Sequence, residues 1–172
     1  MKTFIPLIGA CLLASSLAWS GAESTNDDAA AFGATETIFD VELSADGNKL
    51  VYVGGGAGAT TMAVVIDLTT GNVTQATRGD GKPINIGSCG WSANDRLVCR
   101  LWGMERVDGA IYPVFRTVAM DIDGKNQVFL GQRDTLEQRA KRLNDGRVID
   151  WMNGVDGKVL MQRVYVPQDT TG

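Results

Sequence analysis

The absence with the widest consequences is histidine, of which the chain has none. Without an imidazole, a Ser-His-Asp or Cys-His catalytic arrangement and a histidine-ligated metal site are excluded within these 172 residues. The nucleophile-elbow pattern G-x-S-x-G is missing as well. We therefore expect no catalytic residues in this chain, and any enzymatic activity would depend on residues outside it.

Basic residues are also few. Sixteen Lys and Arg stand against 20 Asp and Glu, which gives a net charge of −4. Nucleic-acid binding depends on a surplus of positive charge that neutralises phosphates, so we expect no nucleic-acid partner.

Long hydrophobic runs are scarce. The longest, residues 4–13, is shorter than the about 20 residues that a membrane-spanning helix needs, so no membrane span is expected. Residues 1–22 carry one charge, at Lys2, and end in small residues, which is typical of a secretory signal peptide. We expect cleavage after Ala22, with Ala18 as a second site, and export to the periplasm or the extracellular space.

Cysteine occurs three times. Cys11 follows leader residues as in a lipoprotein signal, but the apolar run continues past it, which disfavours lipidation. After export, Cys89 and Cys99 would enter an oxidising compartment. If residues 92–96 form a hairpin turn, a disulfide between Cys89 and Cys99 is predicted. Two buried thiols are the alternative. Two cysteines are too few for a zinc site, and we expect neither a metal nor a cofactor.

The order of segments after the leader indicates an all-β chain. Residues 23–33 show no apolar periodicity and are expected to form a flexible mature N-terminus. From residue 34 to residue 172, short apolar segments alternate with turn signals. Segment 39–53 has the pattern strand, Asp-Gly turn, strand, and segment 62–73 predicts a second hairpin.

These two hairpin units recur along the chain. Segment 90–99 repeats the first unit, segment 117–124 repeats the second, and segment 148–161 begins a third copy of the first. Repeats of about 40–60 residues with about four short strands each are typical of β-propeller blades. The predicted fold is a partial β-propeller of two to three four-stranded antiparallel blades, with repeats starting near residues 39, 86 and 147. Because propellers usually have about four to eight blades, we expect a fragment of a longer protein.

Two motifs suggest ligand chemistry but fit turns better. The run 54–59 satisfies G-x-G-x-x-A, yet the β-branched segment 60–66 follows where a dinucleotide site needs a helix. We interpret this run as a flexible hairpin loop. The run 121–126 has two carboxylates before a glycine but lacks the spacing of a calcium-binding loop, so a β-turn is predicted.

The segment between the second and third repeats interrupts the pattern. In residues 134–143, apolar side chains recur at i, i+4 and i+7, which indicates either a short helix or an irregular connection between blades. Arg139, Lys141 and Arg142 form a small basic cluster that we interpret as a solvent-exposed face.

Three segments, 31–33, 39–52 and 148–151, resemble the N-terminal propeller of exported bacterial peptidases of the prolyl oligopeptidase family. The likeness covers roughly residues 31–166, and its Ser-x-Asp-Gly-x-x-apolar pattern also marks TolB-type propellers. The resemblance implies a propeller that restricts peptide access to an α/β-hydrolase domain, which supplies Ser, Asp and His. None of those catalytic positions has a counterpart here.

Two functions follow from these observations. The first is the non-catalytic N-terminal propeller portion of a secreted or periplasmic serine peptidase. Its partners would be the missing C-terminal blades, the hydrolase domain and the peptide substrate. The alternative is a stand-alone secreted TolB-like β-repeat module that binds a protein or a glycan.

Overall fold

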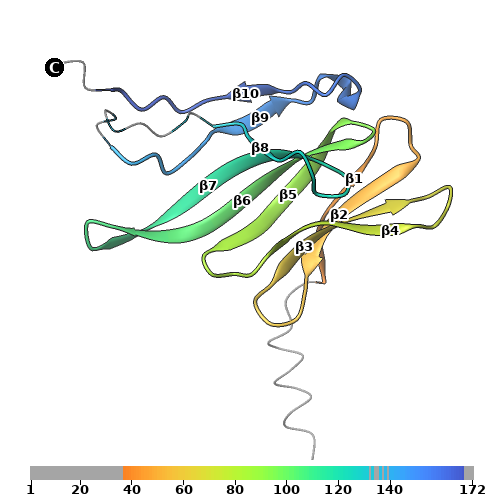
Figure 1. Cartoon of the computed structure of the whole chain (residues 1–172), viewed down its shortest axis with the longest axis horizontal. Coiled ribbons are helices and arrows are strands. Elements are labelled where there is room, and N and C mark those ends of the chain that lie inside the picture. Colours follow the sequence, from red (N-terminus) through yellow and green to blue (C-terminus); the bar gives the residue numbers. More distant parts are fainter. Residues whose placement is uncertain (1–36, 132, 134–135, 137, 139, 169–172) are drawn as a thin grey trace, which may run out of the picture. The chain divides into compact units, whose positions relative to one another are not determined.

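The computed structural model describes residues 37–131, 133, 136, 138 and 140–168 (Figure 1). Ten β-strands and one 3-10 turn account for the regular structure of these residues, so the predicted all-β class is confirmed. The predicted signal peptide, 1–22, and the predicted flexible N-terminus, 23–33, lie outside the described residues. No helix among the residues described is long and apolar enough to cross a membrane.

The first sheet is an antiparallel meander of the first four strands. Its strands are β1 (Ile38–Leu43), β2 (Lys49–Gly55), β3 (Thr61–Asp67) and β4 (Val73–Gly79). β2 and β3 are rich in valine, which packs well on a pleated surface. Between β3 and β4, the Asp67 carboxylate accepts hydrogen bonds of 2.9 Å from the backbone amides of Thr69 and Thr70, which closes the turn.

The second sheet repeats this order with three longer strands and a short fourth one. They are β5 (Ile84–Ala93), β6 (Arg96–Val107), β7 (Ala110–Asp121) and β8 (Val128–Phe129). The β6–β7 hairpin closes through Asp108 and Gly109, whose φ angles are +49° and +86°. Two consecutive positive φ values define a tight hairpin turn for which an Asp-Gly pair is favoured.

The third repeat is shorter than a blade. It consists of β9 (Arg147–Asp150), the 3-10 turn η1 (Met152–Gly154) and β10 (Leu160–Gln162), and only β9 and β10 pair. Four-stranded antiparallel sheets are therefore observed for two of the expected two to three repeats. The part of the chain that the structure describes forms no closed ring of sheets.

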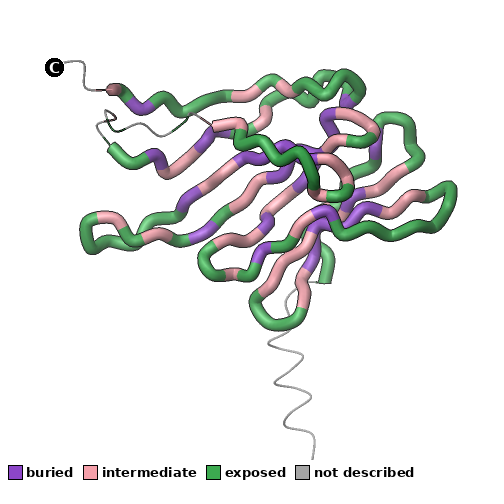
Figure 2. Tube along the Cα trace, in the orientation of Figure 1, coloured by how far each residue is buried: buried purple, intermediate pink, exposed green. Residues whose placement is uncertain are grey.

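The main core lies between the two four-stranded sheets, where Figure 2 shows buried positions in the middle of the strands. Alternation along β2 and β3 directs Val51, Val53 and Val65 to one side of the first sheet. Side chains of the second sheet complete the same buried cluster: Ile86, Cys89, Trp91, Leu97, Cys99, Val118 and Met120.

Candidate functional site

The first strands of the two sheets are tied together by polar contacts. The Asp40 carboxylate accepts a hydrogen bond of 2.9 Å from the backbone amide of Cys89. The Trp91 indole Nε1–H donates to the carbonyl oxygen of Glu42 at 3.1 Å, and the Trp91 side chain is only 5% exposed. Because Trp91 combines a large apolar ring with a satisfied donor, it fixes the position of β5 against β1.

The hairpin beside this contact holds Cys89 and Cys99. Cys89 and Cys99 are opposite each other in the β5–β6 register, and the turn between these strands falls within the predicted residues 92–96. In the structure the two sulfurs are bonded, with an S–S distance of 2.06 Å. Both cysteines are buried, so this pair belongs to the core and offers no accessible thiol for chemistry.

A second tryptophan, Trp151, packs on the first strand of the second sheet. The Trp151 ring lies so close to Gly90 of β5 that a Cβ atom at this position would overlap it. Glu42, which Trp91 contacts, and Gly90, which Trp151 contacts, occupy equivalent positions in the first two repeats. Trp91 therefore joins the first repeat to the second through a hydrogen bond, and Trp151 joins the second repeat to the third by packing on Gly90.

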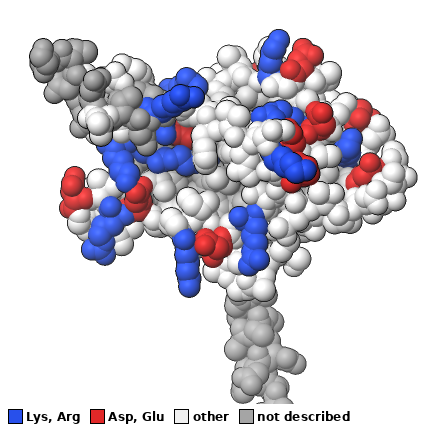
Figure 3. Space-filling model, viewed as in Figure 1, with Lys and Arg blue, Asp and Glu red and all other residues white. Residues whose placement is uncertain are grey.

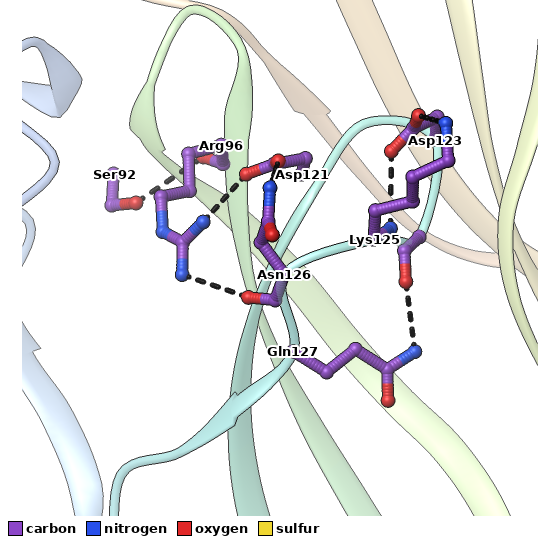
Figure 4. Close-up of polar contacts among 8 residues, drawn as sticks. Ser92, Arg96, Asp121, Asp123, Lys125, Asn126 and Gln127 are labelled. Atoms are coloured by element: carbon purple, nitrogen blue, oxygen red, sulfur yellow. Dashed lines mark hydrogen bonds and ion pairs between the residues drawn. The ribbon is translucent and has the colours of Figure 1, made fainter.

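The carboxylates of the turn after β7 are occupied by neighbouring cations (Figure 4). Asp121 forms an ion pair of 2.5 Å with Arg96, and Asp123 forms one of 2.6 Å with Lys125. The backbone amide of Gly124 donates to the Asp121 carbonyl at 2.8 Å, which confirms the predicted β-turn. Among the described residues, no group of three His, Cys, Asp or Glu is placed to hold a metal ion.

In this turn, Asp123 and Lys125 shift each other's pKa. The Lys125 ammonium donates a hydrogen bond to Asp123, and this contact lowers the pKa of the Asp123 carboxyl. The same contact raises the pKa of Lys125. Both groups are exposed to solvent and keep their ordinary charges at neutral pH, so neither shift prepares an acid or a base for catalysis.

A buried ionic cluster lies where the chain leaves the second sheet. Asp145 is 1% exposed, and its carboxylate accepts a hydrogen bond of 3.0 Å from the backbone amide of Thr117 on β7. The same carboxylate pairs with Arg142 Nε at 2.9 Å, and Arg116 Nη1 lies 4.0 Å away. Arg116 also donates to the carbonyl oxygen of Arg142 at 3.0 Å. These contacts anchor residues 142–145 to the edge of β7.

This cluster corrects one interpretation of the sequence. Arg142 is 7% exposed, so the assignment of Arg139, Lys141 and Arg142 to a solvent-exposed face was wrong for Arg142. Lys141 is exposed and pairs with Glu105, whereas Arg139 lies outside the described residues. Most of the predicted helix or connection at 134–143 lies outside them too. The sequence analysis did not single out Asp145, because the burial of its pair with Arg142 depends on Arg116 and Thr117, nearly 30 positions away.

The glycine-rich run 54–59 begins in β2, where Gly54 and Gly55 pair with β3, and its residues 56–59 lie in the predicted loop between the two strands. A strand follows it instead of a helix, so the run lacks the helix N-terminus on which a dinucleotide phosphate would bind. This loop borders a groove of about 470 Å³ between the two sheets. Phe39 and Trp102 line the groove, each 41% exposed. No ionisable side chain lines it.

Comparisons of the chain with family models, with curated proteins and with solved structures found no match. The described residues form contacts between successive sheets, and a groove lined by uncharged side chains lies beside them. Ser44 Oγ donates a hydrogen bond of 2.6 Å to the Asp46 carboxylate and accepts one of 2.9 Å from the Lys49 amide, so this pair closes the turn between β1 and β2. The buried carboxylate of Asp145 pairs with Arg142.

Proposed function

We propose that this chain is the non-catalytic N-terminal β-propeller portion of an exported serine peptidase similar to the prolyl oligopeptidase family. In this proposal, the stacked sheets gate peptide access to an active site located outside these residues. The observation that carries the proposal is the stacking of two four-stranded meanders through Trp91, followed by the packing of Trp151, next to β9, on the second meander. Blades of a propeller pack on their neighbours in this repetitive way.

The composition supports a gating role. The chain cannot supply the histidine of a serine peptidase, so the catalytic Ser, Asp and His would come from an α/β-hydrolase domain. The partners would be that domain, the remaining blades and the peptide substrate. Export through the leader 1–22 to the periplasm or the extracellular space fits the Cys89–Cys99 disulfide, since disulfides persist in oxidising compartments.

The decisive experiment is to read the gene beyond the codon for Gly172. The proposal predicts that the reading frame continues through further Ser-x-Asp-Gly repeats into a G-x-S-x-G segment, followed by Asp and His. The product of that whole gene should cleave short peptides and be inactivated when the serine of G-x-S-x-G is replaced by alanine. A stop codon directly after Gly172 would contradict the proposal.

The groove beside Phe39 and Trp102 favours a second candidate, a stand-alone secreted TolB-like module that binds a protein partner or a glycan. Exposed aromatic rings in a largely apolar recess are typical of ligand-binding sites. Binding should quench tryptophan fluorescence in the chain, and Trp102→Ala should abolish the change while Ile111→Ala, outside the groove, leaves it intact. Fluorescence that does not respond to a panel of soluble oligosaccharides and secreted proteins would contradict this second candidate.

A further inference from the structure

A row of polar side chains crosses the second sheet on the face that meets the third repeat. Ser88 of β5, Arg100 of β6 and Thr117 of β7 are opposite one another in the strand register. Cross-strand partners project to the same side of a sheet. Val98, two residues before Arg100, projects to this side as well, and it shares a cavity with Val148 of the third repeat. The polar row therefore faces the third repeat.

The polar row lines a cavity of about 180 Å³ between the second sheet and β9. β9 adds Arg147 to its walls, and apolar side chains complete them: Val98, Val148 and Trp151. Two arginines and two residues with hydroxyl groups thus border one space. No carboxylate lines this cavity among the residues described. Asp145, which accepts a hydrogen bond from the Thr117 backbone amide, pairs with Arg142 and is not part of the lining.

The polar groups of this lining are not engaged elsewhere in the part of the chain that the structure describes. Arg100 and Arg147 form no ion pair there, and the hydroxyl groups of Ser88 and Thr117 take part in no hydrogen bond. Thr117 is nevertheless only 2% exposed. Buried polar groups are normally matched by a partner. The cavity therefore presents donors of hydrogen bonds without an anionic acceptor.

Arg100 is held in place by an aromatic ring. Its guanidinium carbon lies 4.5 Å from the centroid of the Phe115 ring. A guanidinium group that stacks on a ring keeps the N–H donors at its edge available. Since the side chain is already ordered, less conformational freedom is lost when a ligand binds to it.

The first sheet carries a carboxylate at the equivalent position. Asp40 pairs with Val53 across β1 and β2, as Ser88 pairs with Arg100 across β5 and β6. The Asp40 carboxylate accepts a hydrogen bond of 2.9 Å from the Cys89 backbone amide, which crosses from the first repeat to the second. The contact between the first two repeats thus includes a carboxylate. At the same place, the contact between the second and third repeats has a serine, with guanidinium groups beside it.

We propose that this cavity binds a small oxyanion, a carboxylate or a phosphate, whose oxygens accept hydrogen bonds from the two arginines and the two hydroxyl groups. Arginine suits both kinds of anion, because its planar fork of N–H donors matches two oxygens at once. The volume is below the about 300–1,000 Å³ that is typical of sites for drug-sized ligands, which favours a small ion.

The site does not depend on the proposed peptidase function, because its lining belongs to the second and third repeats of this chain. On the face shown in Figure 3, Lys and Arg are interspersed with Asp and Glu. No broad surface of one sign lies on that face. Selectivity for an anion should therefore depend on the groups inside the cavity and not on a long-range field.

The test adds sodium phosphate or sodium acetate to the full chain in Tris–chloride buffer, at an ionic strength kept constant with NaCl. Calorimetric titration gives the dissociation constant. At about one hundred times this constant, the anion should raise the melting temperature by about 5–10 °C. Arg147→Gln should weaken binding about tenfold or beyond that, because a charge-assisted hydrogen bond is lost. Arg106→Gln should bind like wild type, since Arg106 is exposed on β6 and does not line the cavity.

A second variant supplies the missing carboxylate from the chain itself. Ser88→Asp places a carboxylate where the first repeat has Asp40. Without added anion, this variant should melt at a higher temperature than Ser88→Asn, which has a side chain of similar size and no charge. The Ser88→Asp variant should also lose its response to phosphate and acetate, because its own carboxylate occupies the arginines, whereas Ser88→Asn should keep part of the response.

Three results would overturn this inference: a wild-type chain that binds neither anion, equal responses of wild type and Arg147→Gln, or a Ser88→Asp variant that binds like wild type. Equal responses would reflect the general effect of such salts on protein stability. A blocked tripeptide with one central glutamate tests a side-chain carboxylate as the source. If it binds and neither free anion does, the assignment to a free ion is wrong. None of these results bears on the proposed peptidase, which is tested by the reading frame after Gly172.

Discussion

Replacing the buried carboxylate with a neutral amide, Asp145→Asn, should destabilise the chain strongly. The substitution preserves size and leaves an oxygen that can still accept the hydrogen bond from the Thr117 amide. It removes the negative charge that faces Arg142 Nε at 2.9 Å and Arg116 Nη1 at 4.0 Å. The change therefore separates the stability that Asp145 provides through its charge from the stability that it provides as a hydrogen-bond acceptor.

The size of the effect follows from these distances. At an effective dielectric constant of about 20, unit charges 4 Å apart attract by about 4 kcal/mol, and closer pairs attract somewhat more. Desolvation of the charged groups cancels part of this attraction. Removing one partner of a buried pair costs about 3–5 kcal/mol, because the other charge stays in the low-dielectric interior. We expect a loss in this range for Asp145→Asn.

The measurement is urea-induced unfolding followed by tryptophan fluorescence. A companion variant, Arg142→Met, should cost a similar amount, and the double variant should cost clearly less than the two single losses together, because neither charge is left alone. Lys141→Met is the control, since Lys141 is 45% exposed in an ion pair with Glu105 and should change stability by about 1 kcal/mol or less. A loss below about 1 kcal/mol for Asp145→Asn, or additive losses in the double variant, would refute the reasoning.

Three further predictions concern the first two sheets. Trp91→Phe should lower the free energy of unfolding by about 2 kcal/mol, since it removes the bond to the Glu42 carbonyl and leaves a void, and urea unfolding would measure this. Replacing Cys89 and Cys99 together by alanine should cost about 2–3 kcal/mol in the same assay, because the bond closes a loop with a sequence separation of 10. The pKa of Asp67 should be about 2 instead of the ordinary 3.8, chiefly because the Thr69 hydroxyl donates to it, and Thr69→Val should raise it in an NMR titration. Since this pKa is lowered by folding, its stabilising effect is complete above about pH 4 and is lost as the pH falls through the folded value.

The hairpins of the first two repeats could be predicted from the sequence because their causes are local. Apolar residues alternate on β1, β-branched residues dominate β3, and Asp-Gly or Asp-x-x-x-Gly signals close the turns between strands. The pairing of Cys89 with Cys99 followed from the same logic, because a short turn centred on residues 94 and 95 determines which residues are opposite. The two-residue periodicity of the strands and the residue types of the turns were sufficient to predict these hairpins and the disulfide.

The ionic cluster could not be predicted, because its cause is a contact between distant segments. Arg142 has basic neighbours in sequence, which is the usual pattern of an exposed surface. It is buried because Asp145 is held against Thr117 by a backbone hydrogen bond, and because Gly131 leaves room for the carboxylate; a Cβ at that position would overlap it. Local periodicity carries no information about such an arrangement.

The strands of the first sheet carry apolar residues on both faces, so the same sequence pattern gives a buried core on one face and exposed apolar side chains on the other. In a sheet with one face in solvent, apolar and polar residues alternate. Here Leu50, Val51, Tyr52 and Val53 follow one another on β2, and only Val51 and Val53 are buried by the second sheet. Val41 and Leu43 of β1 pair with Tyr52 and Leu50 on the other face of this sheet, and both stay exposed. The second sheet covers one of these two apolar faces, and apolar residues on both faces are what a sheet inside a stack of repeats requires.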